Sequence, residues 1–252
     1  MIARFTASKC ILALAFCLFT SAAVAEETAG LEQLTAAETP LVEGEKIAFF
    51  GDSITMQGGH IEAIRKALQT SEHTKDLGIT LIKHGLNGGR VPTVLEGKSP
   101  WGDLGGTMEA LLEKEKPTIV VIQLGVNDVW HGEKGTSKAD YEAGLKQMVA
   151  MSKQAGATVI LCTPSVIGEE TKDNKLTEQL GEYAEIVRKL AADQKVALCD
   201  VHTAFVAELK RLNQANKHSG HLTYDGVHMN KAGNAVLADQ VSRAIVAVRA
   251  AR

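Results

Sequence analysis

Apolar residues along this chain alternate between short continuous runs and longer segments in which they recur every three or four positions. The short runs predict five strands, at residues 46–50, 79–84, 118–124, 158–162 and 196–201. The longer segments predict amphipathic helices, because such spacing places apolar residues on one helix face. They contain Ile61, Ile64 and Leu68; Met108, Leu111 and Leu112; Tyr141, Leu145, Met148 and Val149; and Leu180, Tyr183, Val187 and Leu190. Two later helices are expected near residues 203–215 and 231–249.

This alternation predicts the fold class. Strands that are apolar on both faces need cover on both, and helices between them provide it when the strands run parallel. We expect an α/β three-layer sandwich with a five-stranded parallel sheet of flavodoxin-like type. Ser137 with Asp140 resembles a helix-capping box, and Gly156 lies where a helix C-terminal glycine belongs. The chain has 252 residues, 45% of them hydrophobic, which suits one domain, assigned to residues 45–252.

The N-terminus has the layout of a secretory signal peptide. Arg4 and Lys9 precede an apolar run at 10–19, and small residues follow up to Ala25. We therefore expect residues 1–25 to be a signal peptide that is cleaved after Ala25, which implies a periplasmic or secreted protein. The apolar run is too short to span a bilayer, so no stable membrane insertion is expected after cleavage.

Residues 26–44 are polar and weakly patterned, and they are interpreted as an N-terminal arm. Cleavage would remove two of the 27 basic residues and none of the 30 acidic ones, so the mature chain is mildly acidic. Such a chain with only 4% aromatic residues is not expected to bind nucleic acid. Cys162 and Cys199 would remain after cleavage, and they could form a disulfide or be ordinary core residues.

Ligands of parallel α/β sheets bind beyond the carboxyl ends of the strands. Glycine and small polar residues gather there in "GDSIT", "GLNGGR" and "GVNDVW", and a further polar cluster, "TYDGVHMN", precedes the last helix. Ser53 offers a nucleophilic hydroxyl, and His228 offers a base that Asp225, three residues earlier, could orient. The Asn127 amide and the backbone N–H groups of Ser53 and Gly88 could stabilise an oxyanion.

Two other interpretations of these residues are open. Ser53, followed by Thr55, could cap a helix. The segment "HSGHLTYDGVH" also brings His218, His221, Asp225 and His228 close together, which raises a metal site as a rival. No H-E-x-x-H pattern accompanies them, so the prediction is no metal and no cofactor.

Four blocks resemble, in order and approximate spacing, those of the SGNH hydrolases, also called GDSL esterases and lipases. They are "GDSIT" at 51–55, "GLNGG" at 85–89, "GVND" at 125–128 and "DGVH" at 225–228. The resemblance, from about Lys46 to the last helix, implies the five-stranded fold, with Ser53 as nucleophile and Asp225 and His228 completing the triad. It implies Gly88 and Asn127 as oxyanion donors, although Gly85 and Gly89 compete with Gly88. Asn87 stands where the family pattern often has serine.

The function expected from this resemblance is an exported serine esterase that works through an acyl-enzyme. A compact domain favours a short acyl group, and export suits an acetylated glycan, so the preferred substrate is an O-acetylated carbohydrate. A lysophospholipase or thioesterase remains the alternative within the family, and a non-catalytic glycan- or lipid-binding module is the alternative outside it. Trp130 and His131 could line the substrate pocket and Trp101 could form another wall, or these loops could simply pack on the surface. Asp128 is interpreted as structural.

Overall fold

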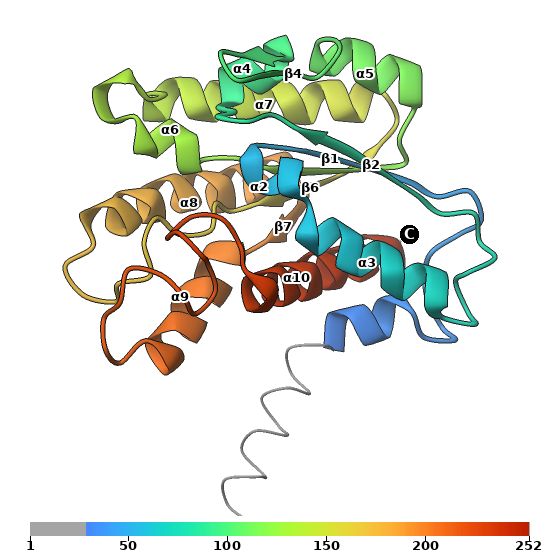
Figure 1. Ribbon diagram of the computed structural model, residues 1–252. Helices are drawn as coiled ribbons and strands as arrows, with labels where there is room; N and C mark the ends of the chain where they lie inside the picture. The colour runs from blue at the N-terminus through green and yellow to red at the C-terminus, as the bar shows by residue number, and fades with distance from the viewer. Residues whose placement is uncertain (1–28, 252) are drawn as a thin grey trace, which may run out of the picture.

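The computed structural model describes residues 29–251 and has a parallel sheet between two layers of helices (Figure 1). The strands are β1 (Lys46–Gly51), β2 (Thr80–Gly85), β5 (Ile119–Gln123), β6 (Thr158–Cys162) and β7 (Ala197–Cys199). Their order is β2-β1-β5-β6-β7 and every pairing is parallel. This is the flavodoxin-like order, so the predicted fold class is confirmed.

The long helices cover both faces of the sheet. They are α3 (Gly59–Thr70), α5 (Met108–Glu115), α7 (Lys138–Gln154), α8 (Lys175–Gln194), α9 (Val201–Leu212) and α10 (Lys231–Ala250). α5, α7 and α8 form one layer, and α3 and α10 pack together in the other, with α9 beside α10. Ser137 caps α7 by accepting the Asp140 N–H at 3.1 Å, and Gly156 follows α7 with φ +83°. Both predicted helix ends are therefore confirmed.

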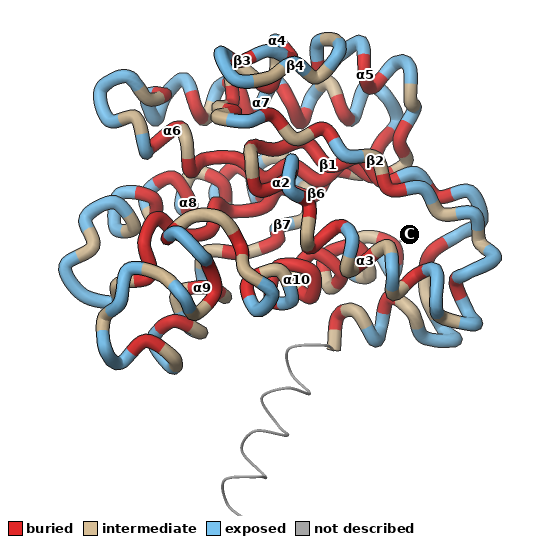
Figure 2. The backbone as a smooth tube through the Cα atoms, viewed as in Figure 1, coloured by how far each residue is buried: buried red, intermediate tan, exposed pale blue. Residues whose placement is uncertain are grey.

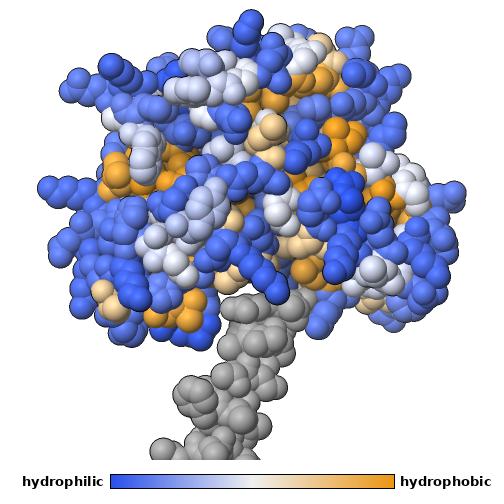
Figure 3. Space-filling model, in the orientation of Figure 1, coloured by the Kyte–Doolittle hydropathy of each residue, from blue (hydrophilic) through white to orange (hydrophobic). Residues whose placement is uncertain are grey.

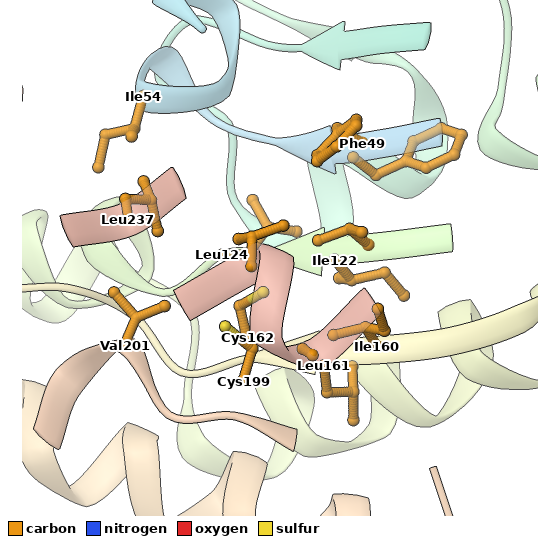
Figure 4. Packing of buried hydrophobic residues seen from close by; sticks show 14 of the residues in the cluster. Phe49, Ile54, Ile122, Leu124, Ile160, Leu161, Cys162, Cys199, Val201 and Leu237 are labelled. Atoms are coloured by element: carbon orange, nitrogen blue, oxygen red, sulfur yellow. The ribbon is translucent and has the colours of Figure 1, made fainter. Parts of the chain in front are cut away.

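The core lies where the central strands face both helical layers (Figure 2). All of β5 is buried, and Phe49 of β1 packs above Ile122 and its neighbours (Figure 4). Cys162 and Cys199 are directly paired residues of β6 and β7, and both are buried free thiols. Of the two interpretations of these cysteines, the structure has the core residues.

Short elements follow the strands at the sheet edge formed by their carboxyl ends, which we call the carboxyl edge. They are α2 (Ser53–Gln57), α4 (Val91–Glu96), α6 (Val126–Trp130), the 3₁₀ turn η1 (Gly132–Lys134) and the hairpin strands β3 (Lys98–Ser99) and β4 (Gly102–Asp103). β1, β2 and β5 end in register, because Gly51 pairs with both Gly85 and Gln123. The loops that follow these three strands therefore start at the same level.

Residues 29–45, which precede β1, pack against the rest of the domain. Residues 29–34 are helical, and Leu34 is fully buried in the core. The Gly30 N–H donates to Asp239 of α10 at 2.6 Å, and buried Glu45 pairs with Arg249 of the same helix. Part of the predicted N-terminal arm is therefore a helix that packs into the core, which its weak sequence pattern did not indicate. The expected signal peptide lies outside the described residues.

Within residues 29–251, no helix combines the length and the apolar character that crossing a membrane requires.

Candidate active site

Ser53 is placed by a sharp turn from β1 into α2. Asp52 is the N-cap of this helix, because its Oδ1 accepts the Ile54 N–H at 2.9 Å. The alternative interpretation of Ser53 as the helix cap is wrong, because the preceding residue makes that bond. Ser53 is the first residue of α2, and its Oγ lies 2.8 Å from His228 Nε2. The hydroxyl therefore bonds to an imidazole instead of to its own helix.

His228 is held by Asp225 on the opposite side of its ring. The distance from His228 Nδ1 to Asp225 Oδ2 is 2.7 Å. Asp225 Oδ1 also accepts the backbone N–H groups of Val227 at 3.0 Å and His228 at 2.7 Å. Partial burial raises the pKa of Asp225, but the bonds from His228 and Val227 outweigh it and hold the pKa below its usual value. The ionised carboxylate keeps a proton on Nδ1, so Nε2 is free to accept one from Ser53.

The loop that carries Asp225 and His228 is anchored by a buried carboxylate that the sequence did not single out. Glu169 accepts the backbone N–H groups of His221 at 2.8 Å, Leu222 at 2.7 Å and Thr223 at 2.5 Å, and the Thr223 hydroxyl at 2.7 Å. Glu169 ends an uninterrupted buried segment that follows β6. Its burial, which would have marked it as important, can be seen only in the folded structure. Its four bonds fix the backbone two residues before the proposed acid of the triad.

Tyr224 covers His228 and was also not predicted. Its ring stacks on the imidazole with centroids 5.8 Å apart, and its hydroxyl accepts from Gln57 of α2 at 2.8 Å. This contact links the helix of Ser53 to the loop of His228. The segments that carry Ser53 and His228 are therefore connected by this contact as well as by their own hydrogen bond.

Gly88 and Asn127 come from the loops after β2 and β5. The N–H groups of Ser53 and Gly88 donate no hydrogen bond within residues 29–251, and Asn127 uses one amide hydrogen, to Gly89 O at 3.2 Å. Gly88 has φ +63°, and a Cβ there would lie 2.3 Å from the Trp101 ring, so only glycine fits. Among the described residues, each of these three groups thus keeps an N–H without a hydrogen-bond acceptor.

Two buried carboxyls support these loops from beneath. Asp128 Oδ1 accepts the Val91 N–H at 3.1 Å and so ties α6 to α4, the structural role predicted for it. Burial raises the pKa of Asp52 to about 7, with Ile54 N–H opposing and the charge of Asp128 adding to the rise. Burial likewise raises the pKa of Asp128 to about 6. These shifts make both carboxyls easier to protonate than an exposed aspartate.

Replacing Asn127 by alanine is expected to lower kcat on p-nitrophenyl acetate by ~10²- to 10³-fold, because one oxyanion donor is lost. Steady-state kinetics check this, with unfolding temperature recorded for each variant. Asn87→Ala is the matched control, since it removes an exposed amide from the neighbouring loop and should change kcat less than about twofold. Equal losses in both variants would contradict the assignment of Asn127.

The residues of the alternative metal site each make hydrogen bonds to different partners. His218 Nδ1 lies 2.8 Å from Glu170, the His221 N–H bonds to Glu169, and His228 lies between Asp225 and Ser53. Across the described chain, no group of three or more histidine, cysteine, aspartate or glutamate side chains is arranged to hold a metal ion.

The predicted pocket residues Trp130 and His131 face different surroundings. His131 stacks on Trp101, with centroids 6.0 Å apart and planes at 9°, so the two rings form one wall over Gly88. Trp130 instead faces a separate hollow beside α8. The structure therefore puts Trp130 and His131 near the site but in different walls.

The fold and this geometry are those of serine hydrolases, which activate a serine hydroxyl through an imidazole oriented by a carboxylate. Residues 49–236 match the GDSL-like Lipase/Acylhydrolase family, and the chain belongs to it. It is a carboxylic ester hydrolase, and the resemblance seen in the four sequence blocks is confirmed.

Known proteins similar to this chain include acetylxylan esterases. That of Geobacillus stearothermophilus is 30% identical over 224 residues, which cover 80% of this chain and 94% of the relative. The crystal structure of the acetyl xylan esterase AlAXEase has a TM-score of 0.71 at 32% identity, covering 80% of this chain and all of that one.

Axe2, an acetylxylan esterase from Geobacillus stearothermophilus, has a TM-score of 0.67 at 28% identity, covering 82% of this chain and 96% of that one. Structures described as its catalytic mutants replace a serine, an aspartate or a histidine by alanine. The latter two residues are three positions apart.

Proposed function

We propose that this protein is an exported serine esterase that removes acetyl groups from O-acetylated carbohydrate through an acyl-enzyme at Ser53. The observation that carries the proposal is the hydrogen-bonded series from Ser53 Oγ to His228 Nε2 and from His228 Nδ1 to Asp225, at 2.8 and 2.7 Å. The related catalytic mutants add support, because Asp225 and His228 have the same three-residue separation.

In the proposed cycle, His228 Nε2 takes the Ser53 proton as Oγ attacks the ester carbonyl. Asp225 stabilises the imidazolium, and the N–H groups of Ser53, Gly88 and Asn127 bind the oxyanion. His228 then protonates the leaving sugar hydroxyl, and the acyl group stays on Oγ. Water, activated by His228, attacks the acyl carbonyl and releases the acid and free Ser53. These steps require no cofactor.

A small acyl group and a carbohydrate leaving group are supported by two features. The Trp101 ring lies against Gly88 and narrows the space beside this oxyanion donor. The relatives described as acetylxylan esterases act on an acetylated polysaccharide, and the chain matches nearly their whole length. Export is supported by the signal-peptide pattern of residues 1–25.

The proposed substrate class is tested by an acyl-chain series of p-nitrophenyl esters together with acetate release from acetylated xylan. We expect kcat/KM to be highest for the acetate and to fall at least ~10-fold towards the octanoate, because extra methylenes meet the Trp101 wall. Acetylated xylan should release acetate. A preference for the octanoate would contradict the acetylesterase assignment and favour the lysophospholipase or thioesterase alternative, and no hydrolysis of any ester would favour a binding module.

A further inference from the structure

A hollow of about 300 Å³ lies between α6, the start of α8 and the loop after β6. Its apolar side is formed by Trp130 and Leu176, which are 47% and 40% exposed. Figure 3 shows exposed hydrophobic side chains on the left of this face, between the places of α6 and α8 in Figure 1. Nothing in the mechanism above uses this hollow.

The hollow shares its walls with the candidate active site. Trp130 is three residues after Asn127 in α6, a spacing that places the two side chains on the same side of the helix. Another residue that lines the hollow, His218, packs against Gly226, where a Cβ would lie 2.5 Å from His218 Nε2. Gly226 lies between Asp225 and His228. A group bound in the hollow would therefore lie beside the substrate of Ser53.

Backbone hydrogen bonds connect the loop after β6, which lines the hollow, to the loop that carries Asp225 and His228. The Gly168 N–H donates to Gly226 O at 2.7 Å, and the Glu169 N–H donates to His218 O at 2.9 Å. The position of the hollow relative to His228 is thus fixed by hydrogen bonds in addition to packing.

The chemistry of the hollow fits a sugar better than an acyl chain. The polar lining of the hollow includes Glu170, Asp173 and His218, with Glu170 held at 2.8 Å by His218 and at 3.2 Å by Asn174. A pyranose has an apolar face of C–H groups that can stack on an indole and an edge of hydroxyls that can donate to carboxylates. A fatty acyl chain would leave these charged groups desolvated without partners. The volume is at the small end of the ~300–1,000 Å³ range of ligand sites, which suits one ring.

The exposed aromatic side chains support this interpretation. Among the described residues, the large aromatic side chains that are exposed are Trp101, Trp130 and Tyr224. Trp101 lies on Gly88 and Tyr224 lies on His228, so each has a partner in the oxyanion or triad region. Trp130 alone of the three faces the hollow. Its exposure is explained if a ring of the substrate covers it.

We infer that this hollow is a glycosyl-binding subsite, in which Trp130 stacks on one pyranose ring of a glycan whose acetylated neighbour lies at Ser53. This inference rests on the proposed function, because it needs a glycan ester as substrate. Trp130 is then a specificity-determining residue for carbohydrate esters and contributes nothing to esters that lack a sugar.

The test compares kcat/KM on acetylated xylo-oligosaccharides with kcat/KM on p-nitrophenyl acetate in the full protein. Trp130→Ala should lower the ratio of the oligosaccharide kcat/KM to the p-nitrophenyl acetate kcat/KM by ~5- to 10-fold, through a higher KM for the oligosaccharide. Trp130→Phe should keep this ratio close to the wild-type value. Val42→Ala is the control, because Val42 is an exposed apolar residue in the segment before β1, and it should leave the ratio unchanged. An unchanged ratio in Trp130→Ala, including equal losses on both substrates, would overturn the subsite.

A binding measurement separates this inference from the proposed function. If the wild type hydrolyses neither substrate, the esterase proposal fails, and isothermal titration with unacetylated xylo-oligosaccharide still tests the hollow. Weaker binding to Trp130→Ala than to the wild type and Val42→Ala supports the subsite. Equal binding to all three, or binding to none, contradicts it.

Discussion

Replacing Ser53 by alanine is expected to lower kcat/KM on p-nitrophenyl acetate by ~10⁴- to 10⁶-fold, with the oxyanion donors giving the residual rate. The reason is that the variant removes the hydroxyl that lies 2.8 Å from His228 Nε2. Because the serine and the histidine act as one unit, Ser53→Ala combined with His228→Ala should be no slower than either single variant. Initial rates of the three variants measure this.

The control for this experiment is Ser137→Ala, which makes the same chemical change at the N-cap of α7. It should lower the free energy of unfolding by ~1 kcal/mol and leave kcat/KM unchanged. Ser53→Ala should show the opposite pattern, since Asp52 and not Ser53 caps α2. Wild-type activity in Ser53→Ala, or multiplying losses in the double variant, would contradict a shared role for Ser53 and His228.

Replacing Asp225 by asparagine is expected to lower kcat/KM at neutral pH by ~10⁴-fold. The asparagine oxygen can keep the bonds from the Val227 and His228 N–H groups, so the loop should hold its shape. Its amide nitrogen would donate to His228 Nδ1, which forces the proton onto Nε2 and removes the base that faces Ser53. The variant therefore separates the tautomer of His228 from its position.

Kinetics and thermal unfolding together check this prediction. Asp76→Asn, the same change on the loop before β2, serves as the control and should alter neither. A loss in Asp225→Asn that is matched by a large drop in unfolding temperature would mean that the carboxylate acts on folding. A loss below about tenfold would exclude the proposed orienting role.

The sheet could be predicted from the sequence because its strands are continuous apolar runs, and β1, β5 and β6 follow those runs within one residue. The loop residues could be predicted because parallel strands bring their carboxyl ends to one edge. Register then starts the loops that carry Ser53 and Asn127 at the same level, since β1 and β5 end together at Gly51 and Gln123.

The short helices could not be predicted, because five or six residues are fewer than two helical turns and the apolar spacing cannot repeat. This applies to α2, α4 and α6, whose ends are set by Asp52, Gly97 and the packing of Gly125 against Pro164. Glu169 and Tyr224 were missed for a different reason. Glu169 accepts from Thr223, 54 residues later, and the Tyr224 hydroxyl accepts from Gln57, 167 residues earlier, so these contacts exist only in the folded structure.

The central claim is that Ser53 carries the acyl group during turnover. p-Nitrophenyl acetate has a good leaving group, so acylation should be faster than deacylation and the acetyl-enzyme should accumulate. The direct measurement is mass spectrometry of enzyme quenched in acid during turnover, followed by peptide mapping. We predict one acetyl group on the peptide that contains Ser53 and none on the Ser53→Ala variant. An acetyl group mapped to another residue, or wild-type turnover by Ser53→Ala, would contradict the account.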